Sequence, residues 1–266
     1  MASLARVGRV GIALSAGSAR GIAHIGVLKV LTEAGVPIDC IAGTSAGAVI
    51  GGIYAATLNL NLMERLACHI KWDILVDLCV PRLGLVSGEK IKEFLRLLTH
   101  DKTFAELAIP FAAVACDLEE GTEVVLREGP VAEAIRASIS IPGIAVPVRL
   151  GGRLLVDGAV LNRVPVNAVR AMGADYVIAC NLTGRAGRAR VRVENIFDVI
   201  TTAIELMEME ILKGKIVEAD IVISPDVGDI GPTRLDMAPE LIKRGEEATR
   251  EALPRILEEI GVNEPS

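Results

Sequence analysis

Short aliphatic runs alternate with longer amphipathic segments along most of the chain. The runs are apolar at consecutive positions, so both faces of the strands they form would be buried, as in a parallel sheet covered by helices. We expect strands at Val10–Leu14, Cys40–Ala42, Phe111–Cys116, Gly121–Arg127, Tyr176–Asn181 and Ile221–Ser224. Val146–Leu150 and Arg153–Val156 flank Gly151-Gly152, which predicts a hairpin with a two-residue turn.

The longer segments repeat apolar residues with helical spacing. Gly35 follows the first of them as a C-cap, and Ser87 precedes another as an N-cap. The expected helices are Ile22–Ala34, Ala46–Leu58, Leu62–Leu78, Glu89–Thr99, Val131–Ser138, Val166–Met172, Glu194–Ala219 and Pro239–Ile260. This alternation predicts an α/β fold with a mainly parallel central sheet between two helical layers. Because we find no repeat, low-complexity segment or linker, we expect residues 1–266 to form a single domain.

The longest uncharged stretch, Cys40–Met63, has the hydropathy of a transmembrane segment. It contains Gly43 and Gly47 near its start and Asn59 near its end, and it divides into a short strand, a turn and a helix. Such a turn would leave backbone N–H and C=O groups unpaired in lipid. We therefore expect this stretch to lie in the protein core rather than in a bilayer.

The composition narrows the class of protein. Of the 266 residues, 51% are hydrophobic but only 3% are aromatic, and the formal charge is −6. Such a chain lacks the basic surface and stacking side chains of a nucleic-acid-binding protein. The five cysteines form no C-x-x-C pair and are interpreted as reduced core thiols, which favours a cytoplasmic protein. Three histidines are too few for a multi-histidine metal site, so we expect no metal and no other cofactor.

The strongest chemical motif is Gly43-Thr44-Ser45-Ala46-Gly47, which matches the nucleophile elbow G-x-S-x-G. A strand precedes it and a helix follows it, as the elbow requires. The turn exposes the serine hydroxyl at the sheet edge, the two glycines let neighbouring backbone pass close, and the helix N-terminus faces the reaction centre. We interpret Ser45 as a nucleophile. The alternative is a glycine-rich turn that only closes a strand–helix unit.

The usual order of serine, acid and histidine is impossible here, because no histidine follows His100. His69 and His100 flank helices and are expected at the surface, whereas His24 is expected to pack in the core. A carboxylate base is the alternative. Asp157 is the best candidate, because it ends a hairpin strand and precedes Gly158. An ordinary Asp-Gly turn is an equally simple interpretation of this pair.

A loop of small residues, Ala16-Gly17-Ser18-Ala19-Arg20-Gly21, joins the first strand to the first helix. Its backbone amides can converge on an anion at a helix N-terminus, as in an oxyanion hole. A P-loop is excluded because no Gly-Lys-Ser/Thr follows, and the spacing does not satisfy the dinucleotide-binding pattern G-x-G-x-x-G.

These motifs occur together with two further blocks. Ala19–Leu28, Gly43–Gly47, Arg136–Gly143, Asp157–Ala159 and Gly228–Gly231 resemble, as a set, bacterial patatin-like phospholipases, which are acyl hydrolases related to patatin and neuropathy target esterase. The resemblance implies a three-layer α/β/α patatin-like fold with Ser45 and Asp157 as a catalytic dyad. It further implies an oxyanion hole formed by Gly17, Ser18, Ala19, Arg20, Gly21 and Ala46.

The loop departs from the family's usual glycine run, because Ala16 and Ser18 replace two of its members. If the backbone needs a positive φ at these positions, each replacement costs about 1 kcal/mol or shifts the amides. Alternatively, the hydroxyl of Ser18 adds a hydrogen-bond donor.

The resemblance implies a serine acyl hydrolase that cleaves lipid carboxylic esters through an acyl-enzyme, as a phospholipase A, a lysophospholipase or an esterase. Two alternatives are a non-catalytic regulatory protein with the same fold and a transacylase with the same dyad. The expected partner is a lipid or ester substrate, met transiently at a membrane surface by a cytoplasmic or peripheral protein. The oligomeric state stays open.

Two segments outside the motifs allow more than one interpretation. Ile74–Leu85 is expected to be either a lid or acyl-binding surface or a part of the core. Arg185, Arg188, Arg190 and Arg192 are expected either to contact anionic lipid or to lie in a solvated loop.

Overall fold

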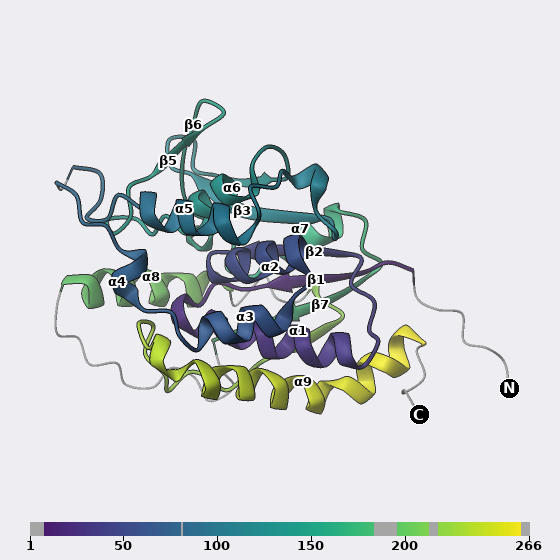
Figure 1. Cartoon of the computed structure of the whole chain (residues 1–266). Helices are drawn as coiled ribbons and strands as arrows, with labels where there is room; N and C mark the ends of the chain where they lie inside the picture. The colour runs from purple at the N-terminus through teal and green to yellow at the C-terminus, as the bar shows by residue number, and fades with distance from the viewer. Residues whose placement is uncertain (1–7, 81, 184–195, 213–217, 262–266) are drawn as a thin grey trace, which may run out of the picture.

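The computed structural model describes residues 8–80, 82–183, 196–212 and 218–261, and within them the strands form one mainly parallel sheet (Figure 1). Its parallel strands lie in the spatial order β3 (Phe111–Asp117), β2 (Cys40–Thr44), β1 (Val10–Leu14), β7 (Tyr176–Cys180) and β8 (Ile221–Ile223). The antiparallel strands are β4 (Thr122–Leu126), β5 (Val148–Leu150) and β6 (Arg153–Asp157). The four arginines between positions 185 and 192 fall outside the described residues.

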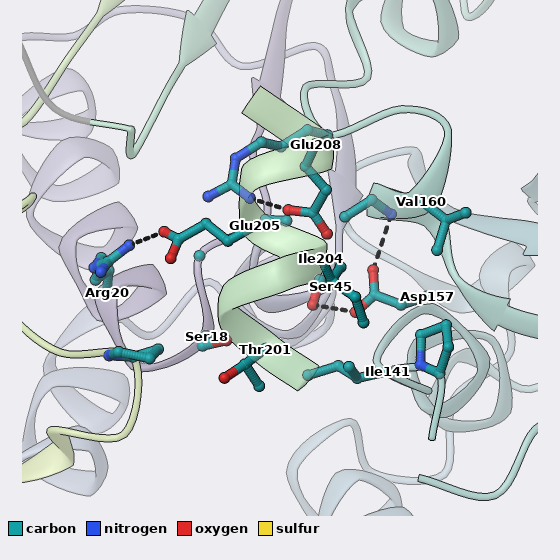
Figure 2. A pocket seen from close by; sticks show the side chains of 16 residues that line it. Ser18, Arg20, Ser45, Ile141, Asp157, Val160, Thr201, Ile204, Glu205 and Glu208 are labelled. Carbon is teal, nitrogen blue, oxygen red and sulfur yellow. Dashed lines mark hydrogen bonds and ion pairs between the residues drawn. The ribbon is translucent and has the colours of Figure 1, made fainter. Parts of the chain in front are cut away.

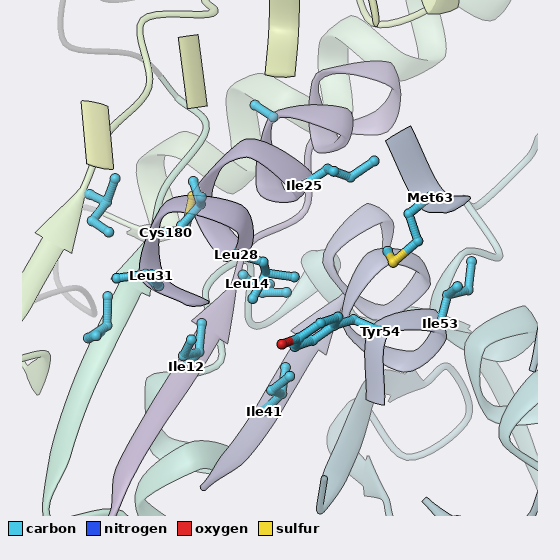
Figure 3. Close-up of a cluster of buried hydrophobic side chains, with 14 of the residues drawn as sticks. Ile12, Leu14, Ile25, Leu28, Leu31, Ile41, Ile53, Tyr54, Met63 and Cys180 are labelled. Atoms are coloured by element: carbon cyan, nitrogen blue, oxygen red, sulfur yellow. The ribbon is translucent and has the colours of Figure 1, made fainter. Parts of the chain in front are cut away.

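Alternate side chains of the central strands face two different helical layers. Ile12 and Leu14 of β1 and Ile41 of β2 lie in a large aliphatic cluster (Figure 3). The helices that share this cluster include α1 (Ala23–Glu33), α2 (Ala46–Thr57), α3 (Leu60–Ala67) and α9 (Ala238–Ile260). Ala13 and Ala42 face the other layer, which is formed by α7 (Val166–Ala171). The expected three-layer α/β/α fold is therefore confirmed.

The remaining helices agree only in part with the sequence-based expectation. They are α4 (Trp72–Leu75), α5 (Glu89–Leu98), α6 (Val131–Ser138) and α8 (Ile196–Leu212). The single helix expected at Leu62–Leu78 is wrong: α3 starts earlier, because Asn59 caps it by accepting a hydrogen bond from the Leu62 amide at 2.9 Å, and it ends before the one-turn helix α4. The helix expected at Glu194–Ala219 lies partly outside the described residues, and within them it forms α8.

Within Cys40–Met63, β2 and most of α2 are buried, as predicted, whereas Leu58, Asn59, Asn61 and Leu62 around the start of α3 are exposed. In the part of the chain that the structure describes, no helix is long and apolar enough to cross a membrane. Cys40, Cys116 and Cys180 are buried free thiols, but Cys68 at the end of α3 is exposed. The interpretation of the cysteines as core thiols is thus wrong for Cys68, because α3 presents that position to solvent.

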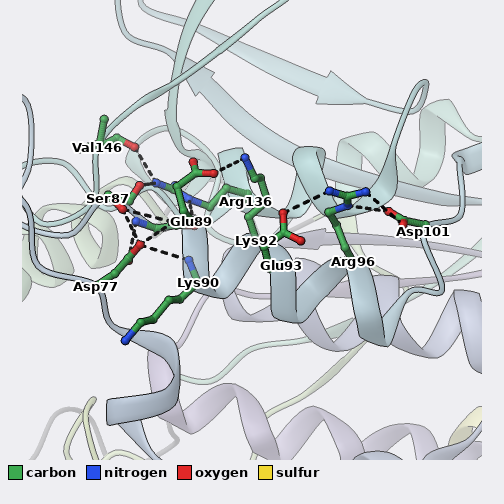
Figure 4. Close-up of polar contacts among 11 residues, drawn as sticks. Asp77, Ser87, Glu89, Lys90, Lys92, Glu93, Arg96, Asp101, Arg136 and Val146 are labelled. Atoms are coloured by element: carbon green, nitrogen blue, oxygen red, sulfur yellow. Dashed lines mark hydrogen bonds and ion pairs between the residues drawn. The ribbon is translucent and has the colours of Figure 1, made fainter.

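Two side chains fix the extended segment between α4 and α5 (Figure 4). The carboxylate of Asp77 accepts a hydrogen bond from the Gly88 amide at 2.8 Å and caps the start of α5. The buried guanidinium of Arg136 donates to the carbonyl oxygens of Gly88 and Val146 at 3.0 and 2.9 Å. The expected N-cap at Ser87 is wrong, because a carboxylate from an earlier segment takes that role.

β3 brings the ends of β2 and β6 together. β4 pairs with residues 113–117 on one edge of β3, so β2 at residues 111–114 and β6 at residues 115–117 must share the other edge. These two strands run in opposite directions. Their C-terminal residues, Thr44 and Asp157, therefore meet head to head.

Candidate active site

Ser45 lies in a strained turn between β2 and α2. Its φ of 54° and ψ of −120° are values that residues with a side chain rarely adopt. A Cβ on Gly47 would lie 2.1 Å from the carbonyl oxygen of Leu14, and a Cβ on Gly43 would lie 2.3 Å from the carbonyl oxygen of Gly47. Gly47 therefore lets the turn pass close to β1, and Gly43 lets the first turn of α2 fold back over the end of β2.

A hydrogen bond joins Ser45 to Asp157, 112 positions later in the chain (Figure 2). Ser45 Oγ donates to Asp157 Oδ2 at 2.6 Å, and the Ala159 amide donates to Asp157 Oδ1 at 2.9 Å. Only 6% of Ser45 and 4% of Asp157 is exposed. The head-to-head strands thus place a hydroxyl and a proton acceptor in direct contact, away from bulk water.

Asp157 has an unusual affinity for its proton. Burial raises the pKa of its carboxyl to about 7, and the neighbouring carboxylate of Glu208 adds to the rise. Hydrogen bonds from Ser45 and Ala159 and the positive charge of Arg163 oppose it. A carboxylate with this pKa is a stronger base at neutral pH than an exposed aspartate.

Two serines that the sequence analysis did not single out hold the backbone of this pair. Ser138, at the end of α6, accepts a hydrogen bond from the Ser45 amide at 2.9 Å and donates to the carbonyl oxygen of Val114 at 2.6 Å. The carbonyl oxygen of Ser140 accepts a hydrogen bond from the Asp157 amide at 2.9 Å. Both serines lie in the block Arg136–Gly143, which signalled the family but gave no role for single residues.

The loop of small residues borders Ser45. Gly17 and Ser18 line the same cavity as Ser45 and Asp157. Gly17 has an extended φ of 178°, whereas Ser18 has a φ of 51°. The left-handed conformation in this loop is therefore carried by a serine, at a cost of about 1 kcal/mol relative to glycine.

Some amides of the loop are already engaged. The Ala19 amide donates to the carbonyl oxygen of Pro232 at 3.0 Å, and the Arg20 amide donates to that of Gly17 at 3.1 Å. In this structure the amides of Ala19 and Arg20 therefore already have backbone acceptors. The amides of Gly17 and Ser18 stay as the candidate donors from the loop.

Gly21 and Ala46 bring the loop and the elbow together. A Cβ on Gly21 would lie 2.3 Å from the Cβ of Ala46, so glycine allows this close approach. Ala46 starts α2 directly after Ser45, where a helix amide has no acceptor in its own helix. The loop and the N-terminus of α2 thus flank Ser45 from two sides.

α8 lies across the site and is joined to it by two ion pairs (Figure 2). Glu205 pairs with Arg20 of the loop, and Glu208 pairs with Arg163. Each of the four side chains is at most 12% exposed. Burial raises the pKa of Glu208, although the charge of Arg163 opposes the rise. The sequence predicted a helix that contains α8, but it gave no signal for the place of α8 over the site or for these pairs, because ion pairs between distant segments follow no spacing rule.

The space above Ser45 is small. Thr201 and Ile204 of α8 line a cavity of about 40 Å³ together with Ser45 and Asp157. This volume holds no more than a few water molecules.

A larger cavity opens from Ser45 in another direction. It measures about 300 Å³ and is lined almost entirely by aliphatic side chains. Among them are Ile22, Val49, Ile50, Ile53, Met63, Leu66, Leu75, Val76, Ile91 and Leu98. The segment Ile74–Leu85 contributes Leu75 and Val76 to this wall, whereas its residues Leu78, Val80 and Leu83 are exposed. A cavity of this shape and polarity accepts a hydrocarbon chain.

The three histidines lie away from the pair. His69 and His100 are exposed, as predicted. His24 is fully buried, with Nε2 at 2.8 Å from the Ser15 carbonyl oxygen and Nδ1 at 3.2 Å from the sulfur of Cys180. Burial lowers the pKa of His24 to about 4, so it is a neutral core residue. Among the described residues, no group of three or more His, Cys, Asp or Glu is arranged to hold a metal ion.

The chain is similar to proteins of a known family. The sequence profile described as patatin-like phospholipase matches residues 12–170. An uncharacterized NTE-family protein of Mycobacterium tuberculosis is 41% identical over 192 residues, which cover 71% of this chain and 53% of that protein. A patatin-like phospholipase domain-containing protein of Caenorhabditis elegans is 34% identical over 65% of this chain and 13% of its own length. The chain thus spans about half the length of the mycobacterial relatives it matches.

Solved structures share the fold at low sequence identity. VipD from Legionella pneumophila superposes with a TM-score of 0.68 over 97% of this chain and 68% of its own, at 13% identity. The type III effector protein ExoU superposes with a TM-score of 0.52 over 97% of this chain and 54% of its own, also at 13% identity.

Proposed function

The chain belongs to the patatin-like phospholipase family, and we propose that it is a serine acyl hydrolase that cleaves carboxylic esters of lipids. The observation that carries the proposal is the 2.6 Å hydrogen bond from Ser45 to Asp157, at a point where an apolar cavity and the loop of small residues meet.

In the first half-reaction, Ser45 Oγ attacks the ester carbonyl carbon while its proton moves to Asp157 Oδ2. The electron pair of the C=O bond moves to the carbonyl oxygen, and the amides of Gly17, Ser18 and Ala46 stabilise the resulting negative charge. The tetrahedral intermediate then collapses. The alcohol leaves with the proton from Asp157, and an acyl-Ser45 ester stays behind.

In the second half-reaction, water attacks the carbonyl carbon of acyl-Ser45 and gives a proton to Asp157. Collapse of the second intermediate releases the fatty acid and returns the proton to Ser45 Oγ. Asp157 thus serves first as base and then as acid in each half-reaction. A pKa of about 7 suits both roles at neutral pH.

The aliphatic cavity supports a lipid rather than a small polar ester as the substrate. This cavity of about 300 Å³ lies next to Ser45. A fatty acyl chain can therefore fill the cavity while its carbonyl group reaches the Ser45 hydroxyl. Removing that chain from water supplies binding free energy of about 0.8 kcal/mol per CH₂ group.

The test is hydrolysis of a panel of phosphatidylcholine, lysophosphatidylcholine and p-nitrophenyl esters by the wild type, Ser45→Ala and Asp157→Asn. We expect each replacement to lower kcat at least about a thousandfold, because the residues act as one unit. Unchanged turnover in either variant would contradict the dyad.

Two measurements separate the alternatives. A fluorophosphonate probe should label Ser45, whereas a regulatory protein with the same fold would stay unlabelled. An added alcohol acceptor should leave free fatty acid as the main product, whereas a transacylase would transfer most of the acyl group to the alcohol.

A further inference from the structure

We propose that α8 is a lid over Ser45, and that it opens when its outer face binds the surface of a lipid aggregate. The proposal rests on the proposed function, since it concerns how a lipid ester reaches the serine. Three features of the molecule carry it: the distribution of side chains on α8, the size of the cavity beneath it and the apolar surface beside it.

α8 turns two buried charges toward the protein and several large aliphatic side chains toward solvent. Glu205 and Glu208 face the protein, where they pair with arginines, and Ile200 and Ile204 lie on the same inner side. Among the α8 side chains that the structure describes, the exposed ones are Ile196, Val199, Ala203, Leu206, Met207, Glu210 and Ile211. Leu206 and Met207 are 53% and 59% exposed. A helix at an ordinary protein surface has the opposite distribution, so this outer face fits an apolar partner.

The closed position of α8 leaves no room for the alcohol part of a substrate. Beneath Thr201 and Ile204 the cavity measures about 40 Å³, while the acyl side offers about 300 Å³. An acyl chain fits without movement, but a glycerol backbone next to the carbonyl carbon does not. α8 must therefore move before Ser45 can attack a lipid ester.

The contact between α8 and the rest of the protein is of a kind that opens readily. It includes two buried ion pairs, and buried ion pairs gain little net free energy because both charges lose their water. Arg20 Nη2 and Arg163 Nε are buried without a hydrogen-bond partner in the described structure. Opening hydrates these nitrogen atoms, which offsets part of the free energy lost with the ion pairs.

The apolar surface continues from α8 onto the segment that follows α4. The carbonyl oxygen of Ile144 accepts a hydrogen bond from the Leu85 amide at 2.8 Å. The adjacent Gly143 faces Ile200 of α8, since a Cβ there would lie 3.6 Å from Ile200 Cδ1. α4 and α8 lie at the same end of the molecule (Figure 1). The exposed apolar residues of the α4 segment are Trp72, Ile74, Leu78, Val80 and Leu83.

The position of this surface selects the partner. The exposed apolar residues of α8 lie on the helix that borders Ser45, and Trp72 of the α4 segment is both exposed and part of the wall of the acyl cavity. The proposed substrate of this site is part of a lipid aggregate. Contact with the aggregate covers the apolar residues and, by drawing α8 outward, admits the substrate. A protein partner or a second copy would cover the same residues but would block the entrance.

Vesicle binding tests the surface independently of catalysis. In a Ser45→Ala background, binding to phosphatidylcholine vesicles should fall at least tenfold when Val199, Leu206 and Met207 are all replaced by serine. Leu97→Ser is the matched control, because Leu97 is 71% exposed on α5 but lies outside the surface, and it should bind as before.

Three results would overturn the assignment. One is vesicle binding that the triple replacement leaves unchanged. Another is binding that needs phosphatidylglycerol and disappears at high salt, which would assign docking to charge. The third is a dimer in sedimentation that the triple replacement dissociates, which would assign the face to a second copy.

The lid is tested by the rate on dihexanoylphosphatidylcholine below and above its critical micelle concentration. The wild type should show a rate increase of at least tenfold when micelles form. Glu205→Gln, which weakens the latch, should raise the rate on the monomeric lipid several-fold, whereas Glu93→Gln, which breaks an exposed ion pair on α5, should not. Hydrolysis of the monomer without an increase at the micelle concentration would overturn the lid and leave the proposed function standing. Absence of any hydrolysis would instead contradict the proposed function.

Discussion

Ser45 Oγ lies 2.6 Å from Asp157 Oδ2, and this hydrogen bond spans the gap between two strands that meet head to head on one edge of β3. Neither residue depends on a flexible loop for its position, because each directly follows or ends a buried strand. Sites built on strands in this way hold reacting groups more accurately than sites built on loops.

The ionisation of Asp157 should control the pH dependence of turnover. Its carboxylate must be unprotonated to accept the serine proton, and its pKa is about 7. We therefore expect kcat/KM on a monomeric ester to fall about tenfold per pH unit below that pKa and to level off above it. The Glu208→Gln variant should move this midpoint to lower pH, because it removes the negative charge that helps to raise the pKa.

The control for this shift is Glu210→Gln, which removes a carboxylate from the exposed side of the same helix. Its pH profile should coincide with that of the wild type. A midpoint that is unmoved in Glu208→Gln would show that Glu208 does not act on Asp157.

The strain at Ser45 should reverse the usual order of stability of glycine and alanine variants. At most positions a glycine variant is less stable than an alanine variant. At a φ of 54° and a ψ of −120°, however, glycine relieves the backbone strain. Both Ser45→Gly and Ser45→Ala remove the hydroxyl. We expect the glycine variant to unfold with a free energy about 1 kcal/mol higher than the alanine variant in urea titrations. If the free energy of unfolding of Ser45→Ala equalled or exceeded that of Ser45→Gly, the turn would have relaxed and lost its strain.

Asp157 should also make the fold less stable as pH rises. Its pKa is raised on folding, so the native state holds the proton more tightly than the unfolded state and loses stability between about pH 4 and pH 7. The Asp157→Asn variant lacks this titration. We therefore compare the free energy of unfolding of Asp157→Asn with that of the wild type at two pH values. The difference in favour of the variant should be a few kcal/mol larger at about pH 8 than at about pH 5. Above about pH 8 the difference should stay constant, because the carboxyl is then ionised in both states.

The strands and the pair of site residues were accessible from sequence, because local patterns specify them. β1 coincides with the predicted Val10–Leu14, and α6 with Val131–Ser138. Because no histidine follows His100, position alone excluded the order serine, acid, histidine and directed attention to a carboxylate. That Ser45 and Asp157 touch follows only from the antiparallel pairing of β6 with β3, which no local pattern specifies.

The contacts that tune the site were not accessible from sequence. Asp77 caps α5 from an earlier segment, Ser138 holds the Ser45 amide across 93 positions, and Glu208 approaches Asp157 from α8. Each depends on a meeting of distant segments in space. The sequence did not show that the aliphatic face of α8 is exposed, because the apolar periodicity of a helix is the same whether that face lies against the core or against solvent.

Ser138 should act as a positioning residue for the nucleophile. Its fully buried hydroxyl accepts a hydrogen bond from the Ser45 amide and donates one to Val114, so Ser138→Ala leaves two buried backbone groups unpaired. We expect a loss of about 1 to 3 kcal/mol in the free energy of unfolding. Because the elbow loses its fixed position, kcat on a monomeric ester should fall at least about tenfold with little change in KM. Ser138→Thr keeps the hydroxyl and should recover most of kcat. If both variants lost stability equally while kcat stayed at the wild-type value, the hydroxyl would contribute to folding alone.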